Sequence, residues 1–185
     1  MIEIDKKQME VVKKLFKGME SKLPTILMRA INRAADNAKT NMGRETSRNY
    51  IVKAGDVKST VKIVKANTRR LGAIVISNGA KVPLYKFKVS PSIPKPKNPP
   101  KAYKVKVKKS GNLKSILGAF VADIHGYNRV MQRESKKRLP ITQLYGPSIP
   151  EMIGNKSVSQ YIENEAAKTL EKRIDHEIKR IMEAK

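Results

Sequence analysis

The sequence predicts an α+β fold with two N-terminal helices, a β-rich antiparallel middle that contains an extended proline-rich loop, and a long C-terminal helix. Three observations support this. Apolar residues recur at helical spacing before residue 50 and after residue 157, β-branched runs separate these two regions, and prolines cluster at 90–100. With 185 residues, we expect a single domain over 1–185, with the proline-rich loop or arm at 89–102.

The N-terminal region predicts a short strand and two helices. Residues 1–4 alternate apolar and charged side chains, and Asp5 can cap a first helix over 6–20. A second helix is expected over 24–48, because Pro24 suits a first turn. Its apolar stripe is rich in alanine and should pack into the core. The stripe comprises Leu23, Ile26, Leu27, Ala30, Ile31, Ala34, Ala38 and Met42.

The middle of the chain predicts short antiparallel strands. A short helix is expected over 56–61, followed by a hairpin whose turn is Thr68-Arg69-Arg70. Lysines alternate with apolar residues at 103–107, which indicates a half-buried strand with one lysine face. The expected strands are 61–67, 71–77, 82–87, 103–107, 118–122 and 128–133.

The proline cluster separates two of these strands. Five of the eleven residues at 90–100 are proline, which removes backbone donors and excludes a helix or a central strand. An extended, partly polyproline segment is expected instead. Two interpretations stay open: a surface loop, or an arm that reaches a neighbouring subunit.

The C-terminal segment predicts the clearest helix of the chain, over 158–185. Glu and Lys/Arg side chains are interspersed on its remaining faces. Its apolar stripe comprises Val158, Ile162, Ala166, Leu170, Ile174, Ile178 and Ile181.

Positive charge is concentrated in the middle of the chain. The net charge is +24, and residues 23–156 hold 28 basic and 6 acidic side chains, whereas both ends are nearly balanced. Residues 81–114 hold eleven lysines and no acid. Three interpretations stay open: binding to nucleic-acid phosphates, binding to acidic proteins, or a solvated face. The candidate surface comprises Lys95, Lys97, Lys101, Lys104, Lys106, Lys108 and Lys109.

Little in the sequence indicates catalysis or a cofactor. Without cysteine and with only two histidines, a thiolate or multi-histidine metal site cannot form within one chain. Asp123 and His125 could lie on one face of a strand, although a structural histidine at a strand end is favoured. No apolar run reaches the roughly 18 residues of a membrane span, and no signal peptide is expected. We therefore expect no enzyme activity, no cofactor, no metal and no membrane association.

One apolar, proline-stiffened stretch precedes the last helix, with the sequence LPITQLYGPSIPEM at 139–152. It predicts an ordered loop, because its prolines restrict the backbone and Gly146 permits a sharp bend. Its apolar side chains should bury against the core or against another subunit. The candidate interface residues are Leu139, Pro140, Leu144, Tyr145, Gly146, Pro147 and Pro150.

This stretch resembles the signature of the phage minor tail protein Z family, also called tail completion proteins. Further likeness lies in the alanine-rich segment 29–34, the passage 50–57, the segment 117–122 and the Arg133-Glu134 pair. The resemblance covers the chain from about residue 2 to 182.

The resemblance implies a structural protein that completes the head-proximal end of a phage or phage-like tail. It implies a virion protein made in the bacterial cytoplasm, in a ring of six copies, that helps to join head to tail and to pass the genome. Its partners would be further copies, tail terminator, tail tube or neck and connector proteins, with genomic DNA in the lumen. The alternative from the charge pattern alone is a non-specific nucleic-acid-binding protein.

Overall fold

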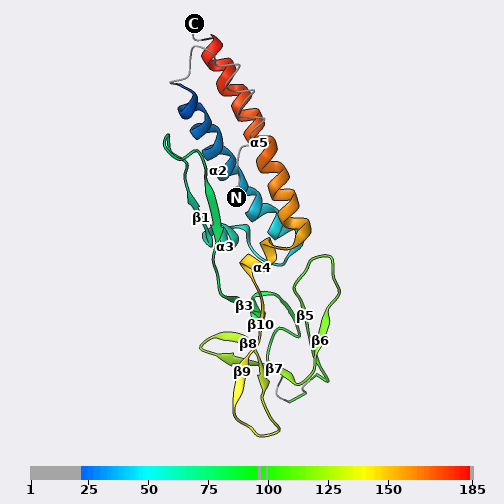
Figure 1. Ribbon diagram of the computed structural model, residues 1–185. Coiled ribbons are helices and arrows are strands. Elements are labelled where there is room, and N and C mark those ends of the chain that lie inside the picture. The colour runs from blue at the N-terminus through cyan, green and yellow to red at the C-terminus, as the bar shows by residue number, and fades with distance from the viewer. Residues whose placement is uncertain (1–21, 96, 99, 184–185) are drawn as a thin grey trace.

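Two halves of different character follow one another along an elongated molecule in the computed structural model (Figure 1). The structure describes residues 22–183 except 96 and 99, so the strand expected at 1–4 and the helix expected at 6–20 lie outside the described residues. The helical half contains α2 (Leu23–Asn49), α3 (Ala54–Ser59), β1 (Val61–Val64), β2 (Ile74–Ser77), α4 (Ile149–Ile153) and α5 (Lys156–Glu183). The β half contains the chain between β2 and α4.

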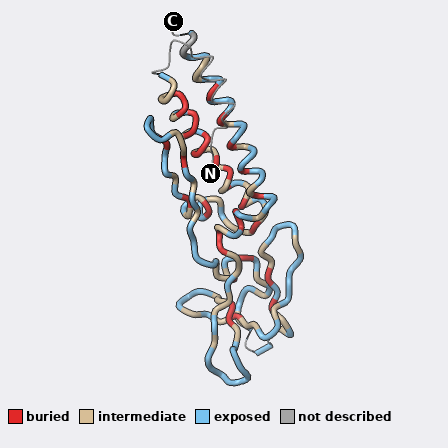
Figure 2. Tube along the Cα trace, viewed as in Figure 1, coloured by how far each residue is buried: buried red, intermediate tan, exposed pale blue. Residues whose placement is uncertain are grey.

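The two long helices, α2 and α5, form an antiparallel pair (Figure 1). The first and the last described residues therefore lie at the same end of the molecule. The predicted apolar stripes of the two helices are confirmed up to Ile178, and the side chain of Ile181 lies outside the described residues. In α2, Ala30, Ala34 and Ala35 are buried, and these small side chains let α5 approach closely. The facing residues of α5 are Val158, Ile162, Ala166, Leu170 and Ile174, all buried. Figure 2 shows this buried seam along the length of both helices.

The predicted hairpin at 61–77 is confirmed, with shorter strands. β1 and β2 pair antiparallel, with Val61 opposite Ser77 and Val64 opposite Ile74. The strands stop early because Asn67 builds the turn: its Oδ1 accepts bonds from the amides of Arg69 and Arg70. The helix expected at 56–61 begins two residues earlier, as α3.

The Asn32 side chain fixes this hairpin to α2. It donates to the Ala66 carbonyl at 3.0 Å and accepts from the Ala66 amide at 2.8 Å. The hairpin therefore covers one side of α2 in a defined register.

Short antiparallel strands make up the β half, as predicted. In chain order the strands are β3 (Lys81–Pro83), β4 (Lys88–Ser90), β5 (Tyr103–Lys106), β6 (Lys114–Ile116), β7 (Ala119–Ile124), β8 (Tyr127–Arg133), β9 (Ile141–Gln143) and β10 (Tyr145–Ser148), and the 3-10 turn η1 (Leu84–Lys86) lies between β3 and β4. They form the sheets β4-β5-β6 and β7-β8-β9 and the pair β10-β3.

The strands expected in the β half were wrong in part. The strand expected at 82–87 breaks after Pro83 into the 3-10 turn η1, which buries Leu84 and directs Phe87 into the core. β4 and β6 were not expected, because three residues are too few to show an alternating pattern. Within the loop expected at 89–102, Val89 and Ser90 belong to β4, and the described residues from 91 to 102 carry no strand and join β4 to β5.

Backbone hydrogen bonds tie the two halves together after α2. The Ile51 amide donates to the Val107 carbonyl at 2.9 Å, and the Lys109 amide donates to the Asn49 carbonyl at 2.8 Å. One apolar cluster runs through the junction, from Val57 and Ala166 in the helical half to Tyr103 in the β half. A second cluster lies between α2, α5 and the tip of the β1-β2 hairpin.

Candidate assembly and polyanion surfaces

The proline-stiffened stretch 139–152 is more regular than the ordered loop that the sequence predicts. It forms β9, β10 and α4, so the expectation of a loop was wrong. Pairing with distant strands, which a local pattern does not reveal, supplies the backbone bonds. The Leu144 amide donates to the Val130 carbonyl, and the Leu144 carbonyl accepts from the Leu84 amide.

Gly146 lies where another chain segment passes very close. A Cβ at this position would be 2.7 Å from Cε2 of Phe87 and 3.3 Å from Cδ2 of Leu84. The glycine therefore lets β10 lie directly against the Phe87 ring. This close approach, and not the sharp bend expected from the sequence, explains why position 146 is a glycine.

A capping box joins β10 to α4. The Ser148 hydroxyl accepts from the Glu151 amide at 3.3 Å, and the Glu151 carboxylate accepts from the Ser148 amide at 2.7 Å. The hydrogen bond from the Ser148 amide to the carboxylate, and next the Ser148 hydroxyl acting on the same carboxylate, lower the pKa of Glu151. Pro150 occupies the first turn of α4, where its missing N–H leaves no bond unmade. The junction is thus fixed by local interactions.

The candidate interface residues divide into an exposed and a partly buried set. Leu139 and Tyr145 are 65% and 52% exposed, and Pro140 is also exposed. The others pack partly against the protein: Leu144, Gly146, Pro147 and Pro150. In the same stretch, Ile149 and Met152 are buried in the core. The stretch therefore anchors itself with some apolar side chains and presents others to solvent.

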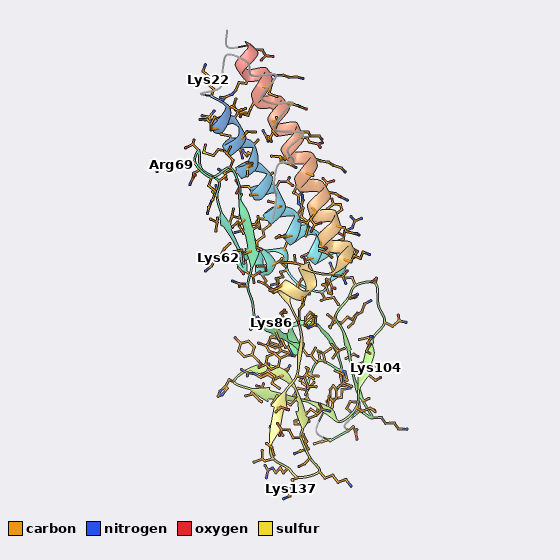
Figure 3. All side chains as sticks on the ribbon, in the orientation of Figure 1. Lys22, Lys62, Arg69, Lys86, Lys104 and Lys137 are labelled. Atoms are coloured by element: carbon orange, nitrogen blue, oxygen red, sulfur yellow. The ribbon has the colours of Figure 1, made fainter. Side chains whose placement is uncertain are left out.

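The candidate lysines lie in and after the proline-rich segment. Lys95, Lys97 and Lys101 belong to that segment, and Lys104 lies on β5; all four are exposed. Lys106, at the end of β5, is half-buried. Lys108 and Lys109 follow β5 and are exposed, with the Lys108 ammonium 5.8 Å from the centre of the Tyr50 ring. Figure 3 shows basic side chains from one end of the molecule to the other.

The strand register brings in a lysine that the sequence analysis missed. Lys88 of β4 stands directly opposite Lys106 of β5, and Ser90 stands opposite Lys104. Like charges at directly opposed positions repel and destabilise a sheet. The alternation of Lys86 and Lys88 with Phe87 indicates that these lysines could share one face. Their pairing with β5 cannot be predicted from the sequence. The β4-β5 pair thus concentrates positive charge on one face.

Ion pairs are confined to the helical half within the described part of the chain. They are Arg29–Glu177, Arg48–Glu45, Lys65–Asp36, Lys168–Glu165 and Arg180–Glu177. From 57 to 122 the sequence contains no acidic residue. The lysines of β4 and β5 therefore lack an acidic neighbour along their own stretch of chain.

Asp123 lies near the end of β7 and His125 lies in the β7-β8 turn, so the two do not share a strand face. The Asp123 carboxylate accepts from the Gly126 amide at 2.9 Å, and His125 has a left-handed backbone with φ 56°. Both residues shape the β7-β8 turn. Within residues 22–183, leaving out 96 and 99, no group of three His, Cys, Asp or Glu side chains is placed to hold a metal ion. No helix in the same described part is long and apolar enough to cross a membrane.

Comparison with protein families decides what kind of protein carries these surfaces. The model of the family described as prophage minor tail protein Z (GPZ) matches residues 6–184. The chain belongs to this family. The resemblance drawn from the stretch 139–152 is therefore confirmed, and the minor tail protein Z family is a family of phage tail structural proteins. Neither curated proteins nor solved structures gave a significant match to the chain.

Proposed function

We propose that this minor tail protein Z homologue completes the head-proximal end of a phage or phage-like tail. It forms a ring of six copies at the tail–neck junction, helps to join head to tail and lets the genome pass. Its partners are further copies of itself, the tail terminator, the tail tube, and neck or connector proteins, with DNA in the lumen. The protein is made in the bacterial cytoplasm and resides in the tail of the virion.

Family membership supports the tail, and the exposed signature side chains support a multi-copy assembly. Leu139 and Tyr145 present apolar surface to solvent: Leu139 precedes β9, and Tyr145 lies on β10 beside the tightly packed Gly146 and the Ser148 cap. A rigid segment with exposed apolar side chains suits a heterologous interface, which closes by rotation into a ring.

We also propose a single working unit over 1–185, which is supported by a core that the two halves share within the described residues. One apolar cluster includes Val57 and Val158 from the helical half and Val105 and Val130 from the β half. The two halves share a core, so we propose that they enter the assembly together. The proline-rich segment 89–102 serves in this proposal as an arm toward a neighbouring copy.

Electron microscopy of particles carrying substitutions in the segment tests this proposal. The double variant Leu139→Ala/Tyr145→Ala should leave tails without a completed end and strongly reduce joined particles. Tyr161→Ala is the matched control, because Tyr161 is an exposed tyrosine on α5, outside the segment. Normal tails with the chain located at their head-proximal end in the double variant would remove the interface claim.

A second candidate function, non-specific binding to nucleic acid, has one specific observation in its favour. The opposed Lys88 and Lys106 repel each other in the free protein, and a phosphate backbone would relieve that repulsion. In a DNA titration at rising salt, affinity should fall steeply, and Lys88→Gln/Lys106→Gln should weaken binding. Lys172→Gln/Lys179→Gln on α5 makes the same charge change as a control. Shallow salt dependence, or equal effects of both variants, would contradict this function.

A further inference from the structure

One face of the sheet β7-β8-β9 combines aromatic, arginine and aliphatic side chains that remain partly in solvent. The sheet lies at the end of the molecule away from the α2-α5 pair (Figure 1). Directly opposed residues of antiparallel strands share a face, and the pair Val121–Val130 carries the face that is buried in the core. The register assigns the opposite face, named here the outer sheet face, to a second set of residues. It carries Phe120, Ile124, Tyr127, Arg129, Arg133 and Ile141.

Contacts within the protein hold the aromatic rings of the outer sheet face in place. Tyr127 is 56% exposed, and its ring centre lies 5.9 Å from that of Tyr85 in η1, with the two rings tilted by 41°. The guanidinium carbon of Arg133 lies 5.3 Å from the centre of the Phe120 ring. Ring–ring and cation–π contacts of this kind restrict side chains that would otherwise rotate. The face is therefore preorganised, which lowers the entropy cost of binding a partner.

The two arginines of the outer sheet face lack an acidic partner among the described residues. Arg129 is half-buried, and its Nη1 donates to the neutral amide oxygen of Gln143 at 3.0 Å. The buried Nε–H of Arg129 has no hydrogen-bond partner in the described part of the chain. Arg133 is exposed, and none of the ion pairs between described residues includes Arg129, Arg133 or the nearby acids Asp123 and Glu134. The face therefore favours an anionic partner.

The apolar area of the outer sheet face distinguishes between two kinds of anionic partner. On the side that Arg133 covers, a base could stack on Phe120 only by displacing the guanidinium. A phosphate backbone has no aliphatic group to cover the half-buried Ile124 and Ile141. A protein surface with carboxylates beside aliphatic side chains matches both the charges and the apolar groups. Tyrosine, phenylalanine and arginine are also enriched in protein interfaces.

A second copy of this chain is a poor source of such a surface. Residues 78–148 contain 16 basic and two acidic side chains. The helix α5 carries more acids, but its residues 156–183 hold six acidic and six basic side chains, so its charge is balanced. A different protein with an acidic surface complements the outer sheet face better.

We propose that the outer sheet face binds an acidic, partly aliphatic surface of a different protein of the particle. Carboxylates of that partner lie against Arg129 and Arg133, and its aliphatic side chains cover Ile124, Tyr127 and Ile141. The inference rests on the proposed function, in which the chain works beside other tail and neck proteins.

Photo-crosslinking in assembled particles tests this inference. Tyr127→p-benzoylphenylalanine retains an aromatic ring at an exposed position of the face. We expect a crosslink to one other protein, through a peptide in which mass spectrometry finds Asp or Glu beside aliphatic residues. Tyr161→p-benzoylphenylalanine is the matched control, because Tyr161 is an exposed tyrosine on α5, and it should not give this product.

Charge-neutral variants connect the crosslink to the two arginines. Arg129→Gln/Arg133→Gln should lower the yield of the crosslinked product at least tenfold, because the partner's carboxylates lose both cations. Lys136→Gln/Lys137→Gln, in the exposed β8-β9 connection, removes the same charge and should leave the yield unchanged. Arg133→Gln alone changes only an exposed side chain and should give an intermediate loss. Urea denaturation of the purified variants separates a lost contact from a lost fold.

Four results would overturn the inference. They are a crosslink only to another copy of the chain, a crosslink to DNA, no crosslinked product in particles that contain the variant chain, and equal losses of yield in the arginine and lysine double variants.

The inference and the proposed function can fail separately. If microscopy locates the chain at the head-proximal end while position 127 crosslinks only to another copy, the inference fails and the proposed function stands. If position 127 crosslinks to an acidic protein away from the head-proximal end, the proposed function fails and the outer sheet face remains a binding surface.

Discussion

The helical half and the β half of this protein distribute burial and charge in opposite ways. In the helical half, α2 and α5 bury a continuous seam of aliphatic side chains, and all the ion pairs among the described residues lie there. In the β half the strands are short, Leu117 and Leu139 are exposed, and Lys88 faces Lys106.

This difference indicates that the two halves have different roles, one in stability and the other in association. The helical half buries a long aliphatic seam between α2 and α5 and holds the ion pairs of the described residues, which suits a stable scaffold, although Val64, Ile76 and Tyr161 are exposed. The β half leaves both kinds of group unsatisfied in the free protein, which is typical of a surface that is completed by partners. Substitutions should therefore affect stability mainly in the first half and association mainly in the second.

The largest effect is expected from Leu27→Ala in the α2-α5 seam. Leu27 is 1% exposed, and truncation of a buried leucine costs about 2–5 kcal/mol through lost transfer energy and a cavity. Leu139→Ala, in the β half, should change stability by no more than about 0.5 kcal/mol. Urea denaturation of both variants measures the contrast. Equal losses would erase the distinction between the halves.

The next effect is expected from Gly146→Ala, one of the tightly packed positions of the β half. Its new Cβ would lie 2.7 Å from the Phe87 ring, so overpacking should cost about 1–3 kcal/mol. Gly55→Ala is the matched control, because a Cβ in α3 meets nothing within 4 Å and the substitution should stabilise by about 0.5–1 kcal/mol. Thermal denaturation of the two alanine variants measures this difference in stability. Unchanged stability of Gly146→Ala would mean that the Phe87 ring moves freely aside.

Ser148→Ala removes the cap of α4 and should cost about 0.5–2 kcal/mol. Ser148→Asp retains an acceptor at the N-cap and should retain most of the stability. Chemical denaturation of both variants measures the contribution. A loss of stability of the same size in both variants would show that the space around Ser148, and not its hydrogen bond, accounts for the loss.

A smaller effect of opposite sign is expected from Lys88→Glu. It replaces a like-charge pair with an opposite-charge pair across β4 and β5, and should stabilise by about 0.2–1 kcal/mol at low salt. Lys62→Glu, opposite Ile76 on the β1-β2 hairpin, controls for the change in net charge. Denaturation at two salt concentrations measures it, and a gain equal to that of Lys62→Glu would mean that the register contributes nothing.

The smallest effect concerns the pH dependence of stability through Glu151. Its pKa lies below the ordinary value of 4.5, because the folded state favours the carboxylate. Its contribution is therefore fully present above that ordinary value and is lost as the pH falls through the lowered pKa. Wild type should exceed Glu151→Gln in stability near pH 7, and the difference should vanish in acid. A difference that persists at pH 2 would assign the effect to shape and not to charge.

Local patterns in the sequence were sufficient for most of the helical half. Periodicity identified the stripes of α2 and α5, and the break Thr68-Arg69-Arg70 between two β-rich runs marked the turn between β1 and β2. These features depend on residues close together in the chain. The family was recognisable for a different reason, since the stretch 139–152 is distinctive as a string of residues.

Features that depend on distant segments could not be predicted. Gly146 looked like a bend, because nothing near it in sequence indicates the Phe87 ring. The stretch around it looked like a loop, because β9 and β10 form by pairing with the distant strands β8 and β3. The Lys88–Lys106 pair depends on the register of β4 against β5. The candidate lysines were found by composition, but their arrangement on a sheet was not.

The passage from β10 to α4 without an intervening residue has a mechanical consequence. Tyr145 and Met152 lie seven residues apart on one continuous, hydrogen-bonded piece of backbone, with one in solvent and the other in the shared core. A force applied to Tyr145 by a neighbouring copy would reach the base of the long helices, because no flexible linker lies between β10 and α4. The short β10-α4 segment would transmit the force as a rigid element, so that a displacement of Tyr145 would tilt the α2-α5 pair of the same copy.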